Sequence, residues 1–378
     1  MNLKSILKAL IPPVILTMKK HYFTVNKFNL FRKSVKHINV RDNSVLIIEF
    51  FTVHGEVLPG LVKYSLDLGY NVDVIIRKPD SFHKESRNDP GLFYCFNNDA
   101  RVNIKTLSSF DMNLLFRSSD IDNYKHIILN TFTDGMEYKE LYKIDLFRLK
   151  PICMIHNPDI NHSYVTTNKI ISLVKMHRIN KKPPYIVNSH YYGNFSRSNK
   201  NTITTFIALN TKDLFRRNIN LLFEATDKLY EKGIYNFHVK IIGNGIPIPD
   251  KYRDNFILFD SLNFQDLYKE ILSSDFILAL IDRASVEYTN KASGSYQLSY
   301  GFLKPLLLQN GFSDISGFTD NNSVLYSDNS ELYDAMNKCI EMSDIDYTNL
   351  IDNLEKTEKE LYSYSLNNLK TVLELPVL

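Results

Sequence analysis

The segment SVLIIEFFTVHGEVLPGLVKYSLDLGYNVDVIIR, Ser44–Arg77, decides the fold class of this chain. It opens with a short, continuous apolar run, Ser44–Phe51, which is typical of a parallel strand covered on both faces. Apolar residues then recur at helical spacing between Pro59, a residue favoured at helix starts, and Gly69, a residue favoured just after helix ends. Because Asn71–Arg77 follows as a second strand, the segment predicts a βαβ unit.

The same alternation continues along both halves of the chain. In the first half we expect a helix near 135–147 and further strands at 101–107, 126–131, 151–156 and 185–189. After a polar stretch at 194–201, the second half predicts strands at 202–209, 237–243, 255–262, 275–281 and 304–309, alternating with helices at 218–233, 263–274 and 293–302. The tail from Ser330 is mostly helical by its pattern.

This alternation predicts an α/β protein with two Rossmann-like, doubly wound parallel-sheet domains that face a cleft. A length of 378 residues agrees, because single cores stop growing at roughly 250–300 residues. The expected parts are a basic amphipathic N-terminal segment (1–40), a first domain (41–196), a second domain (202–345) and a C-terminal helix (346–378).

Composition excludes some classes of protein. The net charge of +3 is too close to neutral for a protein whose main ligand is nucleic acid. Cys95, Cys153 and Cys339 are few and far apart, which suits a reducing compartment and favours the cytosol. The N-terminal segment surrounds an apolar stretch, Ala9–Leu16, with lysines, and this stretch is shorter than the ~20 residues of a membrane-spanning helix. Two interpretations stay open: a segment resting on an anionic membrane surface, or a packed terminal helix.

The loop after the first predicted strand carries a resemblance to a known family. HGEVLPGL, His54–Leu61, is similar to the first strand–loop–helix of the two-domain GT-B glycosyltransferases. Several inverting members read His-Val-x-Pro-Gly-Leu there, whereas this chain has Glu56 where they keep a catalytic His. The resemblance implies a GT-B fold, with the first domain on the acceptor side and the second binding a nucleotide sugar.

The second half is similar to the nucleotide-sugar domain of the family-4-like and family-1-like groups. In the segment 208–229, Lys212 and Arg217 fall on the basic positions that contact the donor diphosphate in those enzymes. The resemblance also implies donor contacts at Gly243 and at Leu262, which lies in the stretch 256–280 that resembles the part leading to the base-binding loop.

The last part of the resemblance covers 287–308, which is similar to the acidic loop, phosphate-facing helix and Gly-x-Pro strand that end the donor site. Family-4-like members carry two Glu around this loop. Here Glu287 matches the first with a one-residue shift, and the second falls near Ser295 or Tyr296. This departure argues against a retaining mechanism, and Glu56 in the base position favours inversion.

Transfer from a nucleotide sugar needs positive groups that stabilise the leaving diphosphate. Lys212 and Arg217 would supply cations, and a helix starting at Ser293, Gly294 and Ser295 would offer N–H groups at the positive end of its dipole. The same residues also fit a less specific interpretation, with solvated cations before one helix and an ordinary N-cap on the other.

The acceptor hydroxyl needs a base. Glu56 is the main candidate, although a carboxylate with an ordinary pKa of ~4.3 is a weak base and would need partial burial. His54 is the alternative. Either residue also fits a structural role, as a helix-start acid and as a loop histidine bonded to backbone. Gly55, His156 and Asn157 are expected on the acceptor side, with a purely structural His156 as the alternative.

Metal and dinucleotide sites have little support in the sequence. The two SDID motifs, 119–122 and 343–346, match the Asp-x-Asp of a different glycosyltransferase fold, but neither follows a strand, so we expect turns or helix caps. The stretch 243–247, GNGIP, lacks the third Gly of a dinucleotide fingerprint. We therefore expect no metal and no cofactor, with a UDP- or GDP-linked sugar as co-substrate.

Together these features predict a metal-independent, inverting glycosyltransferase of the hexosyltransferase type. The resemblance implies a glycan or lipid-linked acceptor in bacterial capsule or lipopolysaccharide synthesis. We expect a cytoplasmic protein, peripheral on the inner face of the cell membrane. Two alternatives stay open: a sugar-nucleotide epimerase of the same fold, and a catalytically silent glycosyltransferase-like partner subunit.

Overall fold

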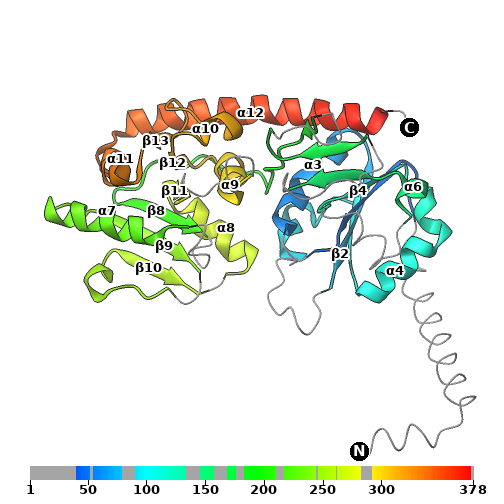
Figure 1. Ribbon diagram of the computed structural model, residues 1–378, viewed down its shortest axis with the longest axis horizontal. Coiled ribbons are helices and arrows are strands. Elements are labelled where there is room, and N and C mark those ends of the chain that lie inside the picture. Colours follow the sequence, from blue (N-terminus) through cyan, green and yellow to red (C-terminus); the bar gives the residue numbers. More distant parts are fainter. Residues whose placement is uncertain are drawn as a thin grey trace, which may run out of the picture.

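Two parallel β-sheets lie side by side, and one long C-terminal helix runs along both (Figure 1). The computed structural model describes residues 40–51, 54–78, 90–132, 145–156, 168–175, 183–209, 217–243, 246–260, 262–281 and 292–375. Within these residues the sheets have seven and six strands, and every strand pair is parallel. The predicted fold class, two doubly wound Rossmann-like domains, is confirmed.

The first sheet has the strand order β3-β2-β1-β4-β5-β6-β7. Its strands are β1 (Ser44–Glu49), β2 (Asn71–Arg77), β3 (Val102–Leu107), β4 (His126–Leu129), β5 (Ile152–Ile155), β6 (Ile170–Ser172) and β7 (Tyr185–Ile186). In the central strand β1, Val45 is in register with Val72 of β2 and with His126 of β4. Since β1 is buried along its whole length, its sequence reads as the continuous apolar run that the fold requires.

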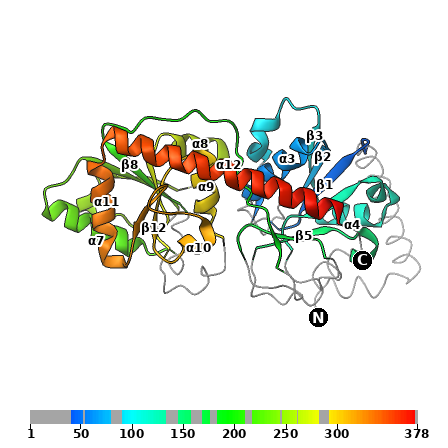
Figure 2. The same ribbon diagram turned by 90° about the horizontal axis from the view of Figure 1, so that it is seen from above.

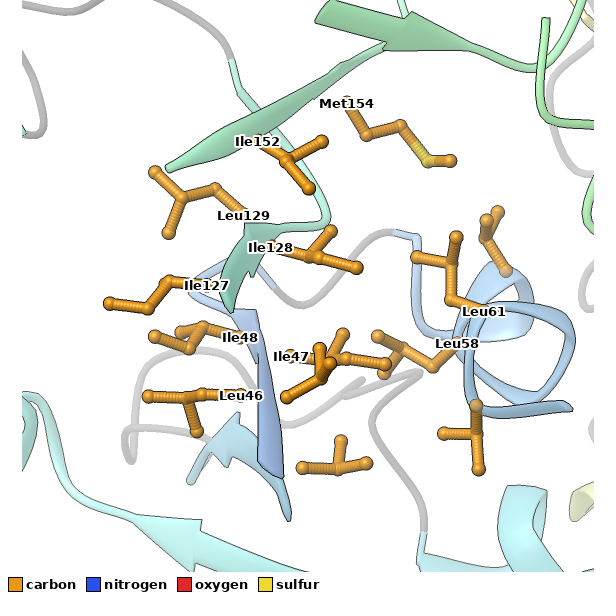
Figure 3. Packing of buried hydrophobic residues seen from close by; sticks show 14 of the residues in the cluster. Leu46, Ile47, Ile48, Leu58, Leu61, Ile127, Ile128, Leu129, Ile152 and Met154 are labelled. Carbon is orange, nitrogen blue, oxygen red and sulfur yellow. The ribbon is translucent and has the colours of Figure 1, made fainter. Parts of the chain in front are cut away.

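Helices cover this sheet and fill its core. The helical elements of the first domain are η1 (Gly55–Val57), α3 (Leu58–Asp67), η2 (Pro90–Phe96), α4 (Ser109–Arg117), η3 (Ser119–Asn123) and α6 (Leu146–Leu149). Figure 3 shows Ile47 of β1 and Ile128 of β4 directed towards Leu58 and Leu61 of α3. All four side chains are fully buried, so the apolar face of α3 fixes the loop that precedes it against the sheet.

The second sheet has the strand order β10-β9-β8-β11-β12-β13. Its strands are β8 (Thr204–Leu209), β9 (Phe237–Ile242), β10 (Phe256–Phe259), β11 (Phe276–Leu278), β12 (Leu306–Gln309) and β13 (Val324–Tyr326). The helical elements of this half are α7 (Ile219–Glu231), η4 (Asp250–Tyr252), α8 (Phe264–Leu272), α9 (Gly294–Phe302), α10 (Ser313–Ser316), η6 (Asn329–Glu331) and α11 (Leu332–Glu341).

Several observed elements differ from the predicted ones. The strand predicted at 275–281 ends at Leu278, because Leu280 takes a left-handed conformation with φ of 50°. Strands β6 and β13 were not predicted, since each has only three residues and shows no periodicity. Helix α4 was also missed, although Ser108 is a clear N-cap that accepts a hydrogen bond from the Asp111 backbone. Most of the helix predicted near 135–147 lies outside the described residues.

Helix α12 (Asp344–Glu374) joins the two halves of the molecule, as Figure 2 shows. Ser343 caps it by accepting from the backbone of Asp346, so the second SDID motif is the helix cap expected from the sequence. Its first part packs on the second-domain core and its last part on the first-domain core, through Tyr347, Leu350 and Ile351 at one end and Leu369, Val372 and Leu373 at the other. No helix in the part of the chain that the structure describes is long and apolar enough to cross a membrane.

Helix α9 packs closely against the chain segment that leaves the first sheet. At Gly301 a β-carbon would stand 2.2 Å from the carbonyl oxygen of His190 and 2.5 Å from the ring of Tyr192. Only glycine fits such a contact. At the other end of the same helix, a β-carbon at Gly294 would meet nothing within 4 Å.

Replacing Gly301 by Ala therefore should destabilise the protein by about 1–3 kcal/mol, because backbone atoms must move to admit one methyl group. Gly294→Ala, the same change in the same helix, should alter stability by less than about 1 kcal/mol. Urea unfolding followed by circular dichroism measures both. Equal stability of the two variants would contradict the close packing of α9.

Candidate active site

Polar side chains gather where strands β1, β4 and β5 end. Glu49 is the last residue of β1, Asn130 and Thr131 follow β4, and His156 follows β5. All four are buried. Because the carboxyl ends of parallel strands share one edge of a sheet, these residues line the edge at which open α/β sheets bind ligands.

The carboxylate of Glu49 is the centre of this group. It accepts hydrogen bonds from the amide of Asn130, from the hydroxyl of Thr131 at 2.6 Å and from the backbone N–H of Phe51 at 2.6 Å. Complete burial raises its pKa to about 7, against the lowering effect of Thr131, Asn130, His54 and Phe51. The side chain therefore exchanges its proton near neutral pH.

Two histidines stack above this network. The rings of His54 and His156 lie 4.0 Å apart and nearly parallel. Asn130 connects them: its side-chain amide donates to the backbone carbonyl of His54 at 2.9 Å, and its backbone carbonyl accepts from Nε2 of His156 at 2.7 Å. The carbonyl acceptor fixes the proton of His156 on Nε2. Glu49 thus holds the loop of His54 in place through Asn130.

Glu56 points from the next turn towards the other domain. Its Oε1 lies 3.6 Å from Nδ1 of His54, and the side chain is 24% exposed. Burial raises the pKa of Tyr192, and the charge of Glu56 raises it further, which places this carboxylate near a tyrosine of the second-domain core. Glu56 therefore has the partial burial that a carboxylate base requires.

In the second domain, Arg217 joins the end of β11 to the start of α9. The side chain is 5% exposed, and its guanidinium donates to the carbonyl of Ala279 and, at 3.0 Å, to the hydroxyl of Ser293. Ser293 is the N-cap of α9, and its hydroxyl also accepts from the backbone N–H of Ser295 at 3.3 Å. The hydroxyl of Ser295 is buried, with no hydrogen-bond partner among the described residues.

This helix start lies against the first domain. Ala292, next to the N-cap, packs on the first-domain core, and so does Phe264 at the start of α8. Aromatic rings fill the junction, with Tyr192 and Tyr268 5.5 Å apart and Tyr94 5.9 Å from Tyr268. The hydroxyls of Tyr192 and Tyr268 are buried and have no hydrogen-bond partner in the described residues. The carboxylate of Glu56 and the start of α9, which the cation Arg217 supports, thus border the same junction between the domains.

The remaining residues expected from the sequence are placed as follows. Gly55 is buried in η1, beside His54 and Glu56. Gly243 follows β9 and donates its N–H to the carbonyl of Phe259 at 2.9 Å, and Leu262 lies just before α8. Lys212, Glu287 and Asn157 lie outside the described residues.

Sequence reasoning missed Glu49, Asn130 and Thr131. A signal was present, since Glu49 is a carboxylate inside an otherwise apolar run, a position that costs free energy unless donors surround it. Across the described ranges, His, Cys, Asp and Glu side chains form no group of three that would hold a metal ion. The first SDID motif forms the turn η3, as expected.

Comparisons with known proteins address the fold. No family model and no curated protein matches the sequence. TarM superposes with a TM-score of 0.57 at 10% identity, over 89% of this chain and 99% of its own. HepE of Anabaena, solved in complex with UDP-glucose, gives a TM-score of 0.54 at 9% identity, over 88% of this chain and 100% of its own.

Both of these proteins have the GT-B architecture. The likeness shows that this chain has the two-domain GT-B fold, which the resemblance of its sequence motifs implied.

Glu49 makes the stability of the protein depend on pH. Its pKa rises from an ordinary 4.5 to about 7 on folding, so its burial costs nothing below pH 4.5 and destabilises the protein increasingly as the pH rises towards 7. Relative to Glu49→Gln, the wild type should lose roughly 2–3 kcal/mol between pH 5 and pH 8. Urea unfolding at both pH values measures this, and a constant difference would contradict it.

Proposed function

We propose that this protein is a glycosyltransferase that moves a sugar from a nucleotide-sugar donor to an acceptor hydroxyl. The observation that carries the proposal is the junction itself: Glu56 and His54 border it from the first domain, and the Arg217-supported start of α9 borders it from the second. The complex of HepE with UDP-glucose supports a nucleotide sugar as the donor.

The second-domain wall suits a diphosphate. The N-terminal end of α9 carries the positive end of a helix dipole, and Gly294 leaves its backbone open to close approach. Arg217 adds a buried cation beside this helix start, and the hydroxyl of Ser295 adds a hydrogen-bond donor. These groups would stabilise the charge that develops on the leaving diphosphate, so we propose a reaction that needs no metal ion.

The first-domain wall suits proton removal. In the proposed step, Glu56 takes the proton of the acceptor hydroxyl while the acceptor oxygen bonds to the anomeric carbon of the sugar. The bond from that carbon to the diphosphate oxygen breaks, and its electron pair leaves with the nucleotide. Attack from the side opposite the leaving group inverts the anomeric configuration. His54, 3.6 Å from Glu56, orients the carboxylate.

More specific assignments come from the sequence. We propose a UDP-linked donor first and a GDP-linked donor second, a hexose as the transferred sugar, and a glycan or lipid-linked acceptor of bacterial capsule or lipopolysaccharide synthesis. The lysine-rich segment 1–39 supports a cytoplasmic protein bound to the inner face of the membrane.

Two experiments separate this proposal from its rivals. An epimerase would convert the donor sugar in the absence of any acceptor, whereas a glycosyltransferase would leave it unchanged or hydrolyse it slowly. A silent partner subunit would bind the nucleotide and show neither transfer nor hydrolysis with any acceptor tested.

Glu56→Gln should lower the turnover number by about 100- to 10,000-fold, because a positioned base contributes that much, while the Kd for the nucleotide changes less than twofold. His54→Gln is the matched control and should lose less activity. Steady-state kinetics and calorimetric titration provide the measurements. If Glu56→Gln stays active and His54→Gln does not, the histidine is the base.

Arg217→Ala should weaken nucleoside diphosphate binding by about 10- to 100-fold, since a hydrogen bond to a charged group contributes roughly 1.5–3 kcal/mol. Arg217→Lys keeps the charge and should lose less affinity. Because the residue is buried, urea unfolding of both variants must show that they are folded under the titration conditions. Unchanged affinity in a folded Arg217→Ala protein would place the donor elsewhere.

A further inference from the structure

A polar cavity lies at the edge of the first sheet opposite to Glu49 and His156. Its volume is about 290 Å³, within the lower range of small-molecule sites. His126, Ile152 and Lys169 line it, and they stand at or directly before the first residues of β4, β5 and β6. Glu49, Asn130 and His156 mark the other ends of this sheet. A four-residue strand spans about 13 Å. The length of the strands therefore separates the two sites.

Positive charge dominates the lining. Lys125, Arg148, Lys150 and Lys169 contribute four cations, and Asp122 contributes one carboxylate. Asp122 is engaged by Arg148, which donates to both of its oxygens at 2.5 and 2.6 Å. The ammonium-bearing side chains of Lys125, Lys150 and Lys169 complete the charged part of the lining, which carries more positive than negative groups.

Two of the lysines make hydrogen bonds to neutral groups. Nζ of Lys125 donates to the side-chain oxygen of Asn43 at 3.1 Å and lies 5.2 Å from the ring centre of Tyr70. Lys169 is 5% exposed, and its Nζ donates to the backbone carbonyl of Leu373 at the end of α12, at 3.3 Å. Ordering and desolvating an ammonium group costs free energy. The placement of the buried Lys169 ammonium at the end of α12 is therefore a specific feature of the fold.

The effect of this charge is visible on a neighbour. Burial lowers the pKa of His126 to about 4, and the charges of Lys169 and Lys125 lower it further. The imidazole is therefore neutral at physiological pH and adds no charge; its Nε2 lies 3.5 Å from the hydroxyl of Tyr70. A cavity with three ammonium groups and a neutral imidazole has the chemistry that recognises a phosphate group.

From this arrangement we infer that the cavity at the amino edge of the first sheet is a second anion site, which binds a phosphate-bearing ligand separately from the nucleotide-sugar site. Either a free phosphorylated molecule or the headgroup of an anionic lipid has this chemistry. The sequence supports the lipid source, because residues 1–39 are rich in lysine and the described chain begins at Val40, three residues before Asn43, which accepts from Lys125.

The test uses the full chain with two exposed lysines reversed, Lys125→Glu with Lys150→Glu. Lys228→Glu with Lys232→Glu is the matched control, because it makes the same charge change at exposed positions of the second domain. Calorimetric titration with inorganic phosphate and co-sedimentation with phosphatidylglycerol vesicles, against phosphatidylcholine vesicles, are measured for all three proteins.

We expect the cavity variant to lose at least tenfold in affinity for phosphate, for the anionic vesicles or for both, while the control pair binds like the wild type. If the cavity variant loses affinity for inorganic phosphate, a free phosphorylated ligand is sufficient. If it loses affinity for the anionic vesicles alone, the ligand is the lipid headgroup. Equal weakening in both variants would show only general surface charge and would overturn the inference. Absence of binding by the wild type to either probe would also overturn it.

Discussion

The contact between Gly301 and the carbonyl of His190 is the constraint on which the arrangement of the two domains depends. It lets α9 approach the segment that leaves the first sheet, and it brings the N-terminal end of that helix towards the loop of Glu56. Helix α12 secures the same region, since Glu358 lies 2.9 Å from the ring nitrogen of the buried His190. Without this approach, each domain would carry half of a site.

The two edges of the first sheet carry different kinds of polar side chains. At the carboxyl edge, Glu49 is surrounded by hydrogen-bond donors and holds the loop of His54 through Asn130. At the amino edge, Lys125, Lys150 and Lys169 line a polar cavity. A parallel sheet separates such groups by construction, because all its strands start at one edge and end at the other. The proposed acid–base chemistry and the inferred anion binding can therefore coexist in one domain.

Local signals were sufficient to predict much of the fold. The apolar run at Ser44, the helix start at Pro59 and the glycine at 69 predicted the first βαβ unit, and the observed β2 has the predicted bounds. Three-residue strands such as β6 escaped prediction because they pair with neighbours that only the tertiary structure supplies.

The candidate site was less accessible from sequence. Glu56 and Arg217 were predicted from their position in motifs, but the stacking of His54 on His156 joins residues about a hundred positions apart. The same holds for Glu49, whose partners Asn130 and Thr131 come from another strand end. Such contacts follow from strand order, which no single-sequence pattern encodes.

The central claim is that one interdomain junction binds the nucleotide sugar between both domains. Hydrogen–deuterium exchange of the full chain, with and without saturating UDP-glucose or its GDP counterpart, tests it most directly. Amide exchange should become slower at residues 54–57 and at 292–296 together when the nucleotide sugar binds. Binding that slows exchange in only one of these segments, or only elsewhere in the chain, would contradict it.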